Sequence, residues 1–390
     1  MKRMAAVAVA LAVVAAACSG GGGTRRARAG ATTTTGPAET TSTARLESGD
    51  LPGMPPLLDP HDVYAADRAG QLSAEVKDFR NLVYVPNSES NSVDVIDPTT
   101  FKTIERFPVG RQPQHVVPSY DLKTLYATND LGNTLTPIDP ATGKPGPTMP
   151  VEDPYNMYFT PDGRFAIVVA ERLQRLDFRD AHTMHLEHSL PVPCRGVDHM
   201  DFSADGRYLL ASCEFGGAVL KVDVAHQTVV GHLVLRVGGM PQDVKLSPDG
   251  KVFYVADQVA GGVYEVDGES LTNIGFLPTG KGAHGLYVSR DSKVMYVSNR
   301  REGSISVVDL ATRSVAKTWH IPGGGSPDMG GVSTDGKVLW LSGRYNSVVY
   351  AIDTDSGAVI ARIPVGRGPH GLCVYPQPGR YSLGHTGVFR

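Results

Sequence analysis

The sequence predicts an all-β fold, a seven-bladed β-propeller of four-stranded antiparallel blades. Three observations support this prediction. One short phrase recurs seven times, short apolar segments separated by turns fill each interval, and the first and last intervals are each incomplete. Repeats of this size bury both of their faces only against their neighbours, so a closed ring is the expected architecture.

The recurring phrase runs from a proline or small residue through alternating apolar residues to a serine or threonine and an Asp-Gly turn. Its clearest copies are residues 154–163, 241–250 and 327–336. The serine or threonine position recurs every 41 to 44 residues, at Ser119, Thr160, Ser203, Ser247, Ser289, Ser333 and Tyr375. A period this constant over about 330 residues indicates one repeat architecture rather than separate domains.

Each interval has the pattern of four short strands. Residues 244–247 alternate and lead into an Asp-Gly turn, and residues 252–256 form a β-branched and aromatic run. The apolar pattern resumes over residues 263–266 and again over residues 274–277. Four antiparallel strands in about 42 residues are typical of a propeller blade.

The ring is predicted to close by joining the two ends of the repeat region. Residues 81–110 lack an opening strand, whereas residues 369–375 consist of an opening strand alone. Together they make one blade, whose innermost strand comes from the C-terminal end of the region and whose other strands come from the N-terminal end. We therefore expect truncation before Gly371 to unfold the propeller.

The N-terminal residues have the pattern of an export signal. Lys2 and Arg3 precede an apolar run over residues 4–17, which is too short to span a bilayer and ends in small residues before Cys18. We expect Cys18 to be lipidated and the protein to be exported and anchored to the outer face of the cell membrane. Ordinary cleavage before a free Cys18 is the alternative.

The predicted organisation has five parts. They are a lipoprotein-type signal peptide (1–17), the lipidated cysteine with a disordered Gly/Thr-rich tether (18–50), an N-terminal extension that packs on the propeller (51–80), the propeller (81–376) and a C-terminal tail (377–390). The tether has almost no large apolar side chains, so it cannot fold alone.

Composition and motifs exclude several function classes. The formal net charge of −3 at pH 7 argues against a dedicated nucleic-acid binder, which is usually clearly basic. The sequence has no C-x-x-C-H motif for covalent haem, no paired C-x-x-C for zinc, no G-x-S-x-G elbow and no Walker loop. A nucleophile-elbow hydrolase or a nucleotidase is therefore not indicated.

Two cysteines are predicted to form a disulfide. Cys194 precedes the innermost strand of one blade and Cys213 ends the second strand, so the hairpin between them brings both to one face. A disulfide is expected in an oxidising compartment, with free thiols or soft metal ligands as the alternatives. Cys373 lies inside an innermost strand and is expected to be a small buried side chain.

Four tetrapeptides carry a family resemblance. Residues 84–87 (YVPN), 126–129 (YATN), 254–257 (YVAD) and 296–299 (YVSN) are variants of one phrase, and an aspartate recurs at the third turn of the blades. In these features residues 81 to about 376 resemble the YVTN-repeat seven-bladed β-propeller family, of the exported bacterial lipoprotein type with WD40-like repeats. The resemblance implies an exported binding or scaffold protein. Related propellers include surface-layer proteins, some lactonases, and metal- or haem-bearing domains of denitrification enzymes.

The sharpest candidate site lies in the loops that lead into the innermost strands. These loops open on one face of the propeller, so their side chains are expected to surround one mouth of the central channel. The two positions before the innermost strand hold histidine in four blades and aspartate or asparagine in others. The candidate ligand-binding residues are His115, Asn156, Asp198, His199, Asp243, His284, Asp328 and His370.

Imidazole and carboxylate groups are the ligands that suit divalent zinc, copper or iron. The candidate metal ligands are His115, His199, His284 and His370. Bonds to such ions are only about 2.0 to 2.2 Å long, whereas a seven-bladed channel mouth is wider than one ion. Two alternatives therefore stay open, a turn-capping role for these side chains and recognition of a polar ligand without metal.

Arginines gather in the loops of the same face. They are Arg111, Arg195, Arg300, Arg301, Arg344 and Arg367. Guanidinium groups match carboxylate and phosphate geometry, which favours an anionic small molecule, a glycan or a nucleic acid. Acidic residues share these loops, so a mixed solvated rim is the alternative.

Three functions are compatible with these features. The leading hypothesis is a cell-envelope module that binds a small molecule or an envelope protein through its loop-bearing channel face. The second is a metal-assisted enzyme, lactonase-like or redox, that uses the His/Asp ring, and the third is a binder of anionic polymers through the rim arginines. The sequence leans away from catalysis without deciding it, assigns no cofactor beyond a candidate divalent transition metal, and predicts a monomer. It does not identify the ligand or the roles of residues 51–80 and 377–390.

Overall fold

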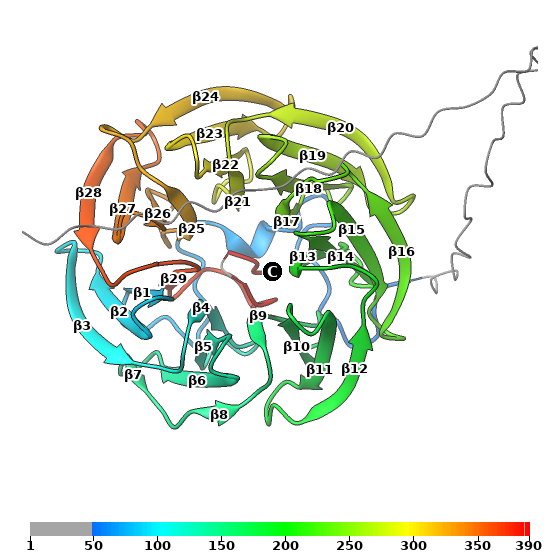
Figure 1. Ribbon diagram of the computed structural model, residues 1–390, viewed down its shortest axis with the longest axis horizontal. Coiled ribbons are helices and arrows are strands. Elements are labelled where there is room, and N and C mark those ends of the chain that lie inside the picture. The colour runs from blue at the N-terminus through cyan, green and yellow to red at the C-terminus, as the bar shows by residue number, and fades with distance from the viewer. Residues whose placement is uncertain (1–48, 386) are drawn as a thin grey trace, which may run out of the picture. The chain divides into compact units, whose positions relative to one another are not determined.

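Seven antiparallel sheets surround a central axis in the computed structural model, which describes residues 49–385 and 387–390 (Figure 1). The predicted seven-bladed propeller is therefore confirmed. Blade 1 contains β29 (Cys373–Tyr375), β1 (Leu82–Asn87), β2 (Ser92–Asp97) and β3 (Lys102–Pro108). Blade 2 contains β4 (Pro113–Pro118), β5 (Leu125–Asn129), β6 (Thr134–Asp139), β7 (Lys144–Pro145) and β8 (Met149–Pro150). Blade 3 contains β9 (Pro154–Phe159), β10 (Phe165–Ala170), β11 (Arg175–Asp180) and β12 (Leu186–Pro191).

Blades 4 to 7 follow without interruption along the chain. Blade 4 contains β13 (Val197–Phe202), β14 (Tyr208–Cys213), β15 (Ala218–Asp223) and β16 (Thr228–Val234), and blade 5 contains β17 (Pro241–Leu246), β18 (Val252–Asp257), β19 (Gly262–Asp267) and β20 (Thr272–Pro278). Blade 6 contains β21 (Ala283–Val288), β22 (Val294–Asn299), β23 (Ser304–Asp309) and β24 (Ser314–His320). Blade 7 contains β25 (Pro327–Val332), β26 (Val338–Gly343), β27 (Val348–Asp353) and β28 (Val359–Pro364). In blades 2 to 7 the first strand lies innermost (Figure 1).

Ring closure occurs in blade 1, as the incomplete intervals predict. Strand β29 pairs antiparallel with β1, so that Leu82 lies opposite Tyr375 and Tyr84 lies opposite Cys373. The Tyr375 hydroxyl also donates a hydrogen bond to the backbone carbonyl of Leu122 in blade 2. Residues from the two ends of the propeller are thus held in one sheet.

The recurring serine or threonine is explained by the turn that follows the innermost strand. The Ser247 hydroxyl donates to Asp249 Oδ1 at 2.6 Å and accepts the Val252 N–H at 2.9 Å. Gly250 completes this turn with a φ of +71°, in the left-handed region that glycine enters without strain. The same hydroxyl-to-aspartate bond forms at Thr160, Ser203, Ser289 and Ser333.

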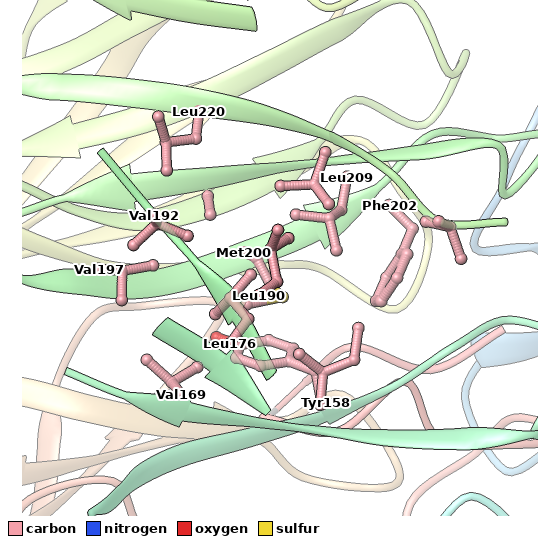
Figure 2. Close-up of a cluster of buried hydrophobic side chains, with 14 of the residues drawn as sticks. Tyr158, Val169, Leu176, Leu190, Val192, Val197, Met200, Phe202, Leu209 and Leu220 are labelled. Atoms are coloured by element: carbon pink, nitrogen blue, oxygen red, sulfur yellow. The ribbon is translucent and has the colours of Figure 1, made fainter. Parts of the chain in front are cut away.

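Burial follows the position of a strand in its blade. The innermost and second strands are buried on both faces, whereas outermost strands such as β28 alternate between exposed and partly buried residues. Between blades 3 and 4, Val169 and Leu176 lie in one cluster with Val197, Met200 and Leu209 (Figure 2). Burying each such side chain contributes about 1.5 to 3 kcal/mol, so contacts between blades stabilise the ring.

The N-terminal extension contacts the face that carries the Asp-Gly turns. The Leu51 N–H donates to the Asp205 carbonyl at 2.8 Å, the Val63 N–H to Pro248 at 2.8 Å and the Gly70 N–H to Thr334 at 3.0 Å. A short 3-10 helix, η1 (Ala65–Asp67), lies in this segment. The extension therefore covers the face opposite the loops that lead into the innermost strands.

The C-terminal tail enters the central channel after β29, and the C-terminus lies near the centre of the ring (Figure 1). The Leu383 carbonyl accepts the Phe159 N–H at 2.9 Å, and Gly384 forms a bridge with Tyr158 of β9. Arg390 donates to Asp201 at 3.0 Å. The tail thus fills the channel from the side of the Asp-Gly turns.

The predicted signal peptide and Cys18 lie outside the described residues, as does all of the tether except its last residues. Within residues 49–385 and 387–390, no helix has the length and apolar character needed to cross a bilayer.

Candidate functional site

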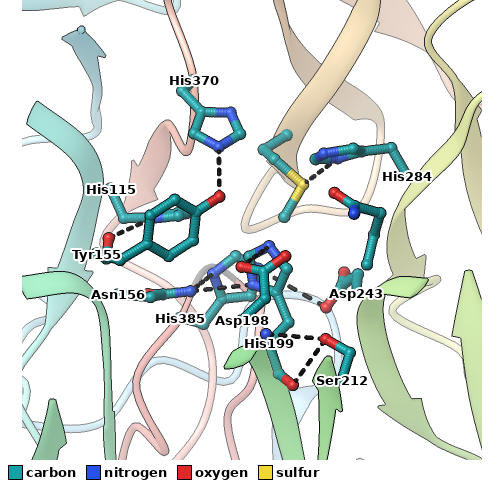
Figure 3. Close-up of polar contacts among 12 residues, drawn as sticks. His115, Tyr155, Asn156, Asp198, His199, Ser212, Asp243, His284, His370 and His385 are labelled. Atoms are coloured by element: carbon teal, nitrogen blue, oxygen red, sulfur yellow. Dashed lines mark hydrogen bonds and ion pairs between the residues drawn. The ribbon is translucent and has the colours of Figure 1, made fainter. Parts of the chain in front are cut away.

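A local irregularity of the innermost strands builds the channel site. Pairing with the second strand skips two residues after the first residue of β4, β13, β17, β21 and β25. Such bulges re-aim side chains, and they occur where the candidate residues lie. The eight predicted positions are all buried. Figure 3 labels seven of them around the channel, and the eighth, Asp328, is bonded to His370.

Three imidazoles converge in the channel, two from the predicted set and one from the tail. His115 of β4, His199 of β13 and His385 offer ring nitrogens that all lie within 4.8 Å of one another. Their ring centroids are 5.4 Å apart for His115 and His199, 5.2 Å for His115 and His385, and 4.6 Å for His199 and His385. We call these residues the histidine trio.

The Nδ1 atom of each ring in the trio has a partner. His115 Nδ1 is 3.0 Å from the Tyr155 carbonyl oxygen, so it donates there. The carboxamide nitrogen of Asn156 is 3.0 Å from His199 Nδ1 and 3.1 Å from His385 Nδ1 (Figure 3). The three Nε2 atoms are buried and make no hydrogen bond of good geometry among the described residues, although His199 Nε2 lies 3.3 Å from Asp198 Oδ1 and His385 Nε2 lies 3.8 Å from Asp243 Oδ1.

The other two predicted histidines are bonded to Asp328, and the His370 ring also packs beside His115, with the two ring centroids 4.9 Å apart. His370 Nδ1 is 2.8 Å from Asp328 Oδ2, and His284 Nδ1 is 3.3 Å from Asp328 Oδ1. Arg300 donates to the same Oδ1 at 3.0 Å. The four candidate metal ligands thus fall into two pairs, of which only His115 and His199 join the trio.

Burial dominates the electrostatics of the channel. It lowers the pKa of His115 to about 4, and it holds the pKa values of His199, His284, His370 and His385 well below their usual range. All of these imidazoles are therefore neutral at pH 7. Burial, followed by the charges of Glu214 and Glu171, raises the pKa of Asp198 well above its usual range.

A second ring of polar residues lies directly after the second strands, on the loop-bearing face. It is acidic in blades 2 to 4 and basic in blades 6 and 7: Ser88, Asp130, Glu171, Glu214, Gln258, Arg300 and Arg344 in blade order. We call it the mouth ring. Burial and then Glu214 raise the pKa of Glu171 to about 8, whereas Arg344 acts on the pKa values of His115 and His370. The mouth of the channel is therefore electrically polarised.

The six predicted rim arginines differ in exposure. Arg300 and Arg344 belong to the mouth ring and are partly buried, whereas Arg111, Arg195, Arg301 and Arg367 are exposed. Arg300 also donates to Gln258 Oε1 at 2.7 Å and lies over the Tyr345 ring, 5.6 Å from its centroid. Arg344 Nη1 and Arg300 Nε are buried without a hydrogen-bond partner in the described part of the chain.

A disulfide pins the acidic side of the mouth. Cys194 and Cys213 are bonded, with their Cα atoms 5.9 Å apart, and Glu214 follows directly. Cys373 is a free, buried thiol. The disulfide joins the loop before β13 to the end of β14, so it restrains the backbone next to Asp198 and Glu214.

Sequence reasoning missed His385, the third member of the trio. It belongs to no repeat, so no spacing marks it. The one available signal was topological: because the innermost strands line the channel, a segment that follows such a strand starts beside the channel. Tyr155, whose carbonyl oxygen accepts from His115 Nδ1, is also not among the predicted site residues.

Comparison with known proteins supports the fold and leaves the ligand open. Antigen Lp49 of Leptospira interrogans is 33% identical over 169 residues, which is 37% of this chain and 36% of the antigen, so the chain spans about a third of that relative. The 6-phosphogluconolactonase of Serratia proteamaculans is 22% identical over 56% of this chain and 74% of that protein.

A solved structure and a family profile complete the comparison. Hydrazine synthase of Kuenenia stuttgartiensis superimposes with a TM-score of 0.62 at 18% identity, covering 73% of this chain and 97% of that chain, which shows a shared fold. The profile of the YNCE-like beta-propellers matches residues 71–378. Because that match spans most of the sequence and the structure is a closed propeller, the chain belongs to the YNCE-like beta-propeller family.

Proposed function

We propose that this protein is an envelope-anchored binding module that takes a small molecule at the mouth ring. The ligand has an anionic group at one end and hydrogen-bond donors at the other. The anionic group faces Arg300 and Arg344, and the donors face Glu171 and Glu214. One observation carries the proposal: the mouth ring is basic on one side and acidic on the other.

Partner-less donors support the basic side of this site. Arg344 Nη1 and Arg300 Nε are buried, and neither has an acceptor in the described part of the chain. A buried donor without a partner is costly, and it costs more when it is charged. A carboxylate or phosphate entering from the loop-bearing face would accept from both guanidinium groups.

The acidic side suits hydroxyl or ammonium groups. Glu214 is close enough to Arg300 and Arg344 for both to act on its pKa, which places the two sides within reach of one small molecule. Because the pKa of Glu171 is raised to about 8, its carboxyl group is mostly protonated at pH 7 and can both donate and accept.

A small molecule fits these features better than an anionic polymer. The exposed arginines Arg111, Arg195, Arg301 and Arg367 come from four different blades, and Glu89, Asp130 and Glu302 lie in the same set of loops. A polymer would need a continuous basic surface. The two partly buried arginines instead lie side by side in the ring order, in blades 6 and 7.

Lactone hydrolysis is a second candidate function, favoured by the alignment with 6-phosphogluconolactonase over 74% of that protein. Hydrolysis of a sugar lactone produces a hydroxy acid, which has the ligand chemistry proposed for the mouth ring. The same mouth ring would then hold the product, with water as the second reactant.

The test is calorimetric titration of the purified protein with gluconate, 6-phosphogluconate and a panel of amino acids. We expect at least one to bind, and Arg344→Ala to weaken it by roughly 10- to 100-fold, since a charged hydrogen bond contributes about 1.5 to 3 kcal/mol. Arg367→Ala, on the exposed rim, is the matched control and should bind as the wild type does. Equal binding by Arg344→Ala, or no binding in the panel, contradicts the proposal.

Gluconolactone and its 6-phosphate separate binding from catalysis. Acid release followed in a pH-stat, above the spontaneous rate and abolished by Arg344→Ala, supports the lactonase function. Binding of the hydroxy acid without lactone turnover leaves the binding module alone.

A further inference from the structure

We propose that the histidine trio binds one divalent transition-metal ion of the zinc class, with the C-terminal tail supplying the third ligand. The ligands are His115, His199 and His385. This site lies inside the channel and is distinct from the mouth ring, so it does not depend on the small-molecule proposal.

The spacing of the trio is close to what an ion requires. Zinc–nitrogen bonds are about 2.0 to 2.1 Å long, which places the nitrogens of a tetrahedral site roughly 3.3 Å apart. In the trio, one ring nitrogen from each residue lies within 4.8 Å of one ring nitrogen from each of the other two. Small side-chain rotations therefore suffice to bring them to bonding distance.

Partner-less buried atoms point to a missing ligand. The Nε2 atoms of His115, His199 and His385 are buried with no hydrogen-bond partner in residues 49–385 and 387–390. Asp198 Oδ1 lies 3.3 Å from His199 Nε2, but neither oxygen of Asp198 meets hydrogen-bond geometry with a described residue. Groups of this kind normally find a partner, and an ion among them would serve all four side chains.

Asp198 is also the carboxyl group that lies closest to an imidazole of the trio. Its carboxyl group is fully buried, and Asp243 Oδ1 lies 3.8 Å from His385 Nε2. Lys245 is buried and close enough to act on the pKa values of His199, His385 and Asp243.

The surrounding contacts orient the rings. His115 Nδ1 donates to the Tyr155 carbonyl at 3.0 Å, which leaves the Nε2 lone pair free, as in metal-bound histidines. Asn156 turns its carboxamide nitrogen toward His199 and His385, and this arrangement keeps their protons on Nε2. Metal binding moves these protons to Nδ1, so the Asn156 carboxamide must make a half-turn and present its oxygen.

The position of Asn156 yields a gain-of-function test. A carboxylate accepts hydrogen bonds from both Nδ1 groups without any half-turn, and outer partners of this type change metal affinity by 10- to 100-fold. Asn156→Asp should therefore bind the ion about 10-fold or more tightly than the wild type. A purely structural role for Asn156 predicts no gain.

The experiment is titration of the chelator-treated, folded protein with Co²⁺, monitored by visible absorption, and with Zn²⁺ by calorimetry. We expect one ion per chain and the intense absorption of a low-symmetry cobalt site. His385→Gln, His115→Gln and His199→Gln should each weaken binding by about 100-fold or more. His284→Gln is the matched control, because His284 is equally buried in the channel but is bonded to Asp328, and it should keep the ion.

A second measurement keeps the proposal testable if the tail variant does not fold. X-ray absorption of the zinc-loaded wild type should count three imidazoles around the ion. No stoichiometric uptake by the folded wild type, fewer than three imidazoles, or unchanged affinity in folded His385→Gln each overturns the proposal.

Discussion

Closure of the ring by residues 369–390 can be tested by removing them. Besides Cys373, the deletion takes away six apolar side chains that are each 3% exposed or less: Leu372, Val374, Tyr375, Leu383, Val388 and Phe389. At about 1.5 to 3 kcal/mol each, their burial amounts to roughly 9 to 18 kcal/mol. The whole stability of a domain is typically about 5 to 15 kcal/mol. The shortened chain should therefore lack a cooperative melting transition.

Differential scanning calorimetry and near-ultraviolet circular dichroism are the appropriate assays. A synthetic peptide of residues 369–390, added to the shortened chain during refolding, should restore a cooperative transition, because the edge of β1 is left unpaired without β29. The same peptide with Val374→Asp is the control and should not restore it. A shortened chain that melts cooperatively within a few degrees of the wild type would refute the reasoning.

Three further predictions concern the disulfide, the mouth and the anchor. Replacing Cys194 and Cys213 by serine opens a loop of 19 residues, which should cost about 3 kcal/mol and lower the Tm. Anion binding at the mouth should weaken as pH rises through about 8, where Glu171 loses its proton and adds negative charge; titrations of Glu171→Gln at several pH values should lack this dependence. Cys18→Ser should move the protein from the membrane to the soluble fraction, and unchanged fractionation would exclude lipidation.

Much of the fold could be predicted because each repeat carries its own signals. The predicted phrases at 154–163, 241–250 and 327–336 open at Pro154, Pro241 and Pro327, which are the first residues of the innermost strands β9, β17 and β25. Strand β29 begins at Cys373, later than the predicted opening at Pro369, which forms only an isolated bridge to Asn87. The composite blade has no Asp-Gly turn after its innermost strand, since the chain leaves for the tail there.

The candidate site could be predicted only in part. Repeat positions place residues around the channel, but they do not say which side chains meet. In the structure Asp328 bonds both His284 and His370, and the distances that allow this cannot be read from the spacing of the repeats. His385 arrives from outside the repeats, so its contact with His115 and His199 follows from the path of the tail alone.

The composite blade also has a consequence for biosynthesis. Its strands β1 to β3 are complete at Pro108, whereas β29 begins only at Cys373. At 5 to 20 residues per second, the ribosome takes roughly 13 to 50 s to make the chain between them. During that interval β1 presents an open edge that can pair with another nascent chain. The first blade to be translated is thus the last to be completed.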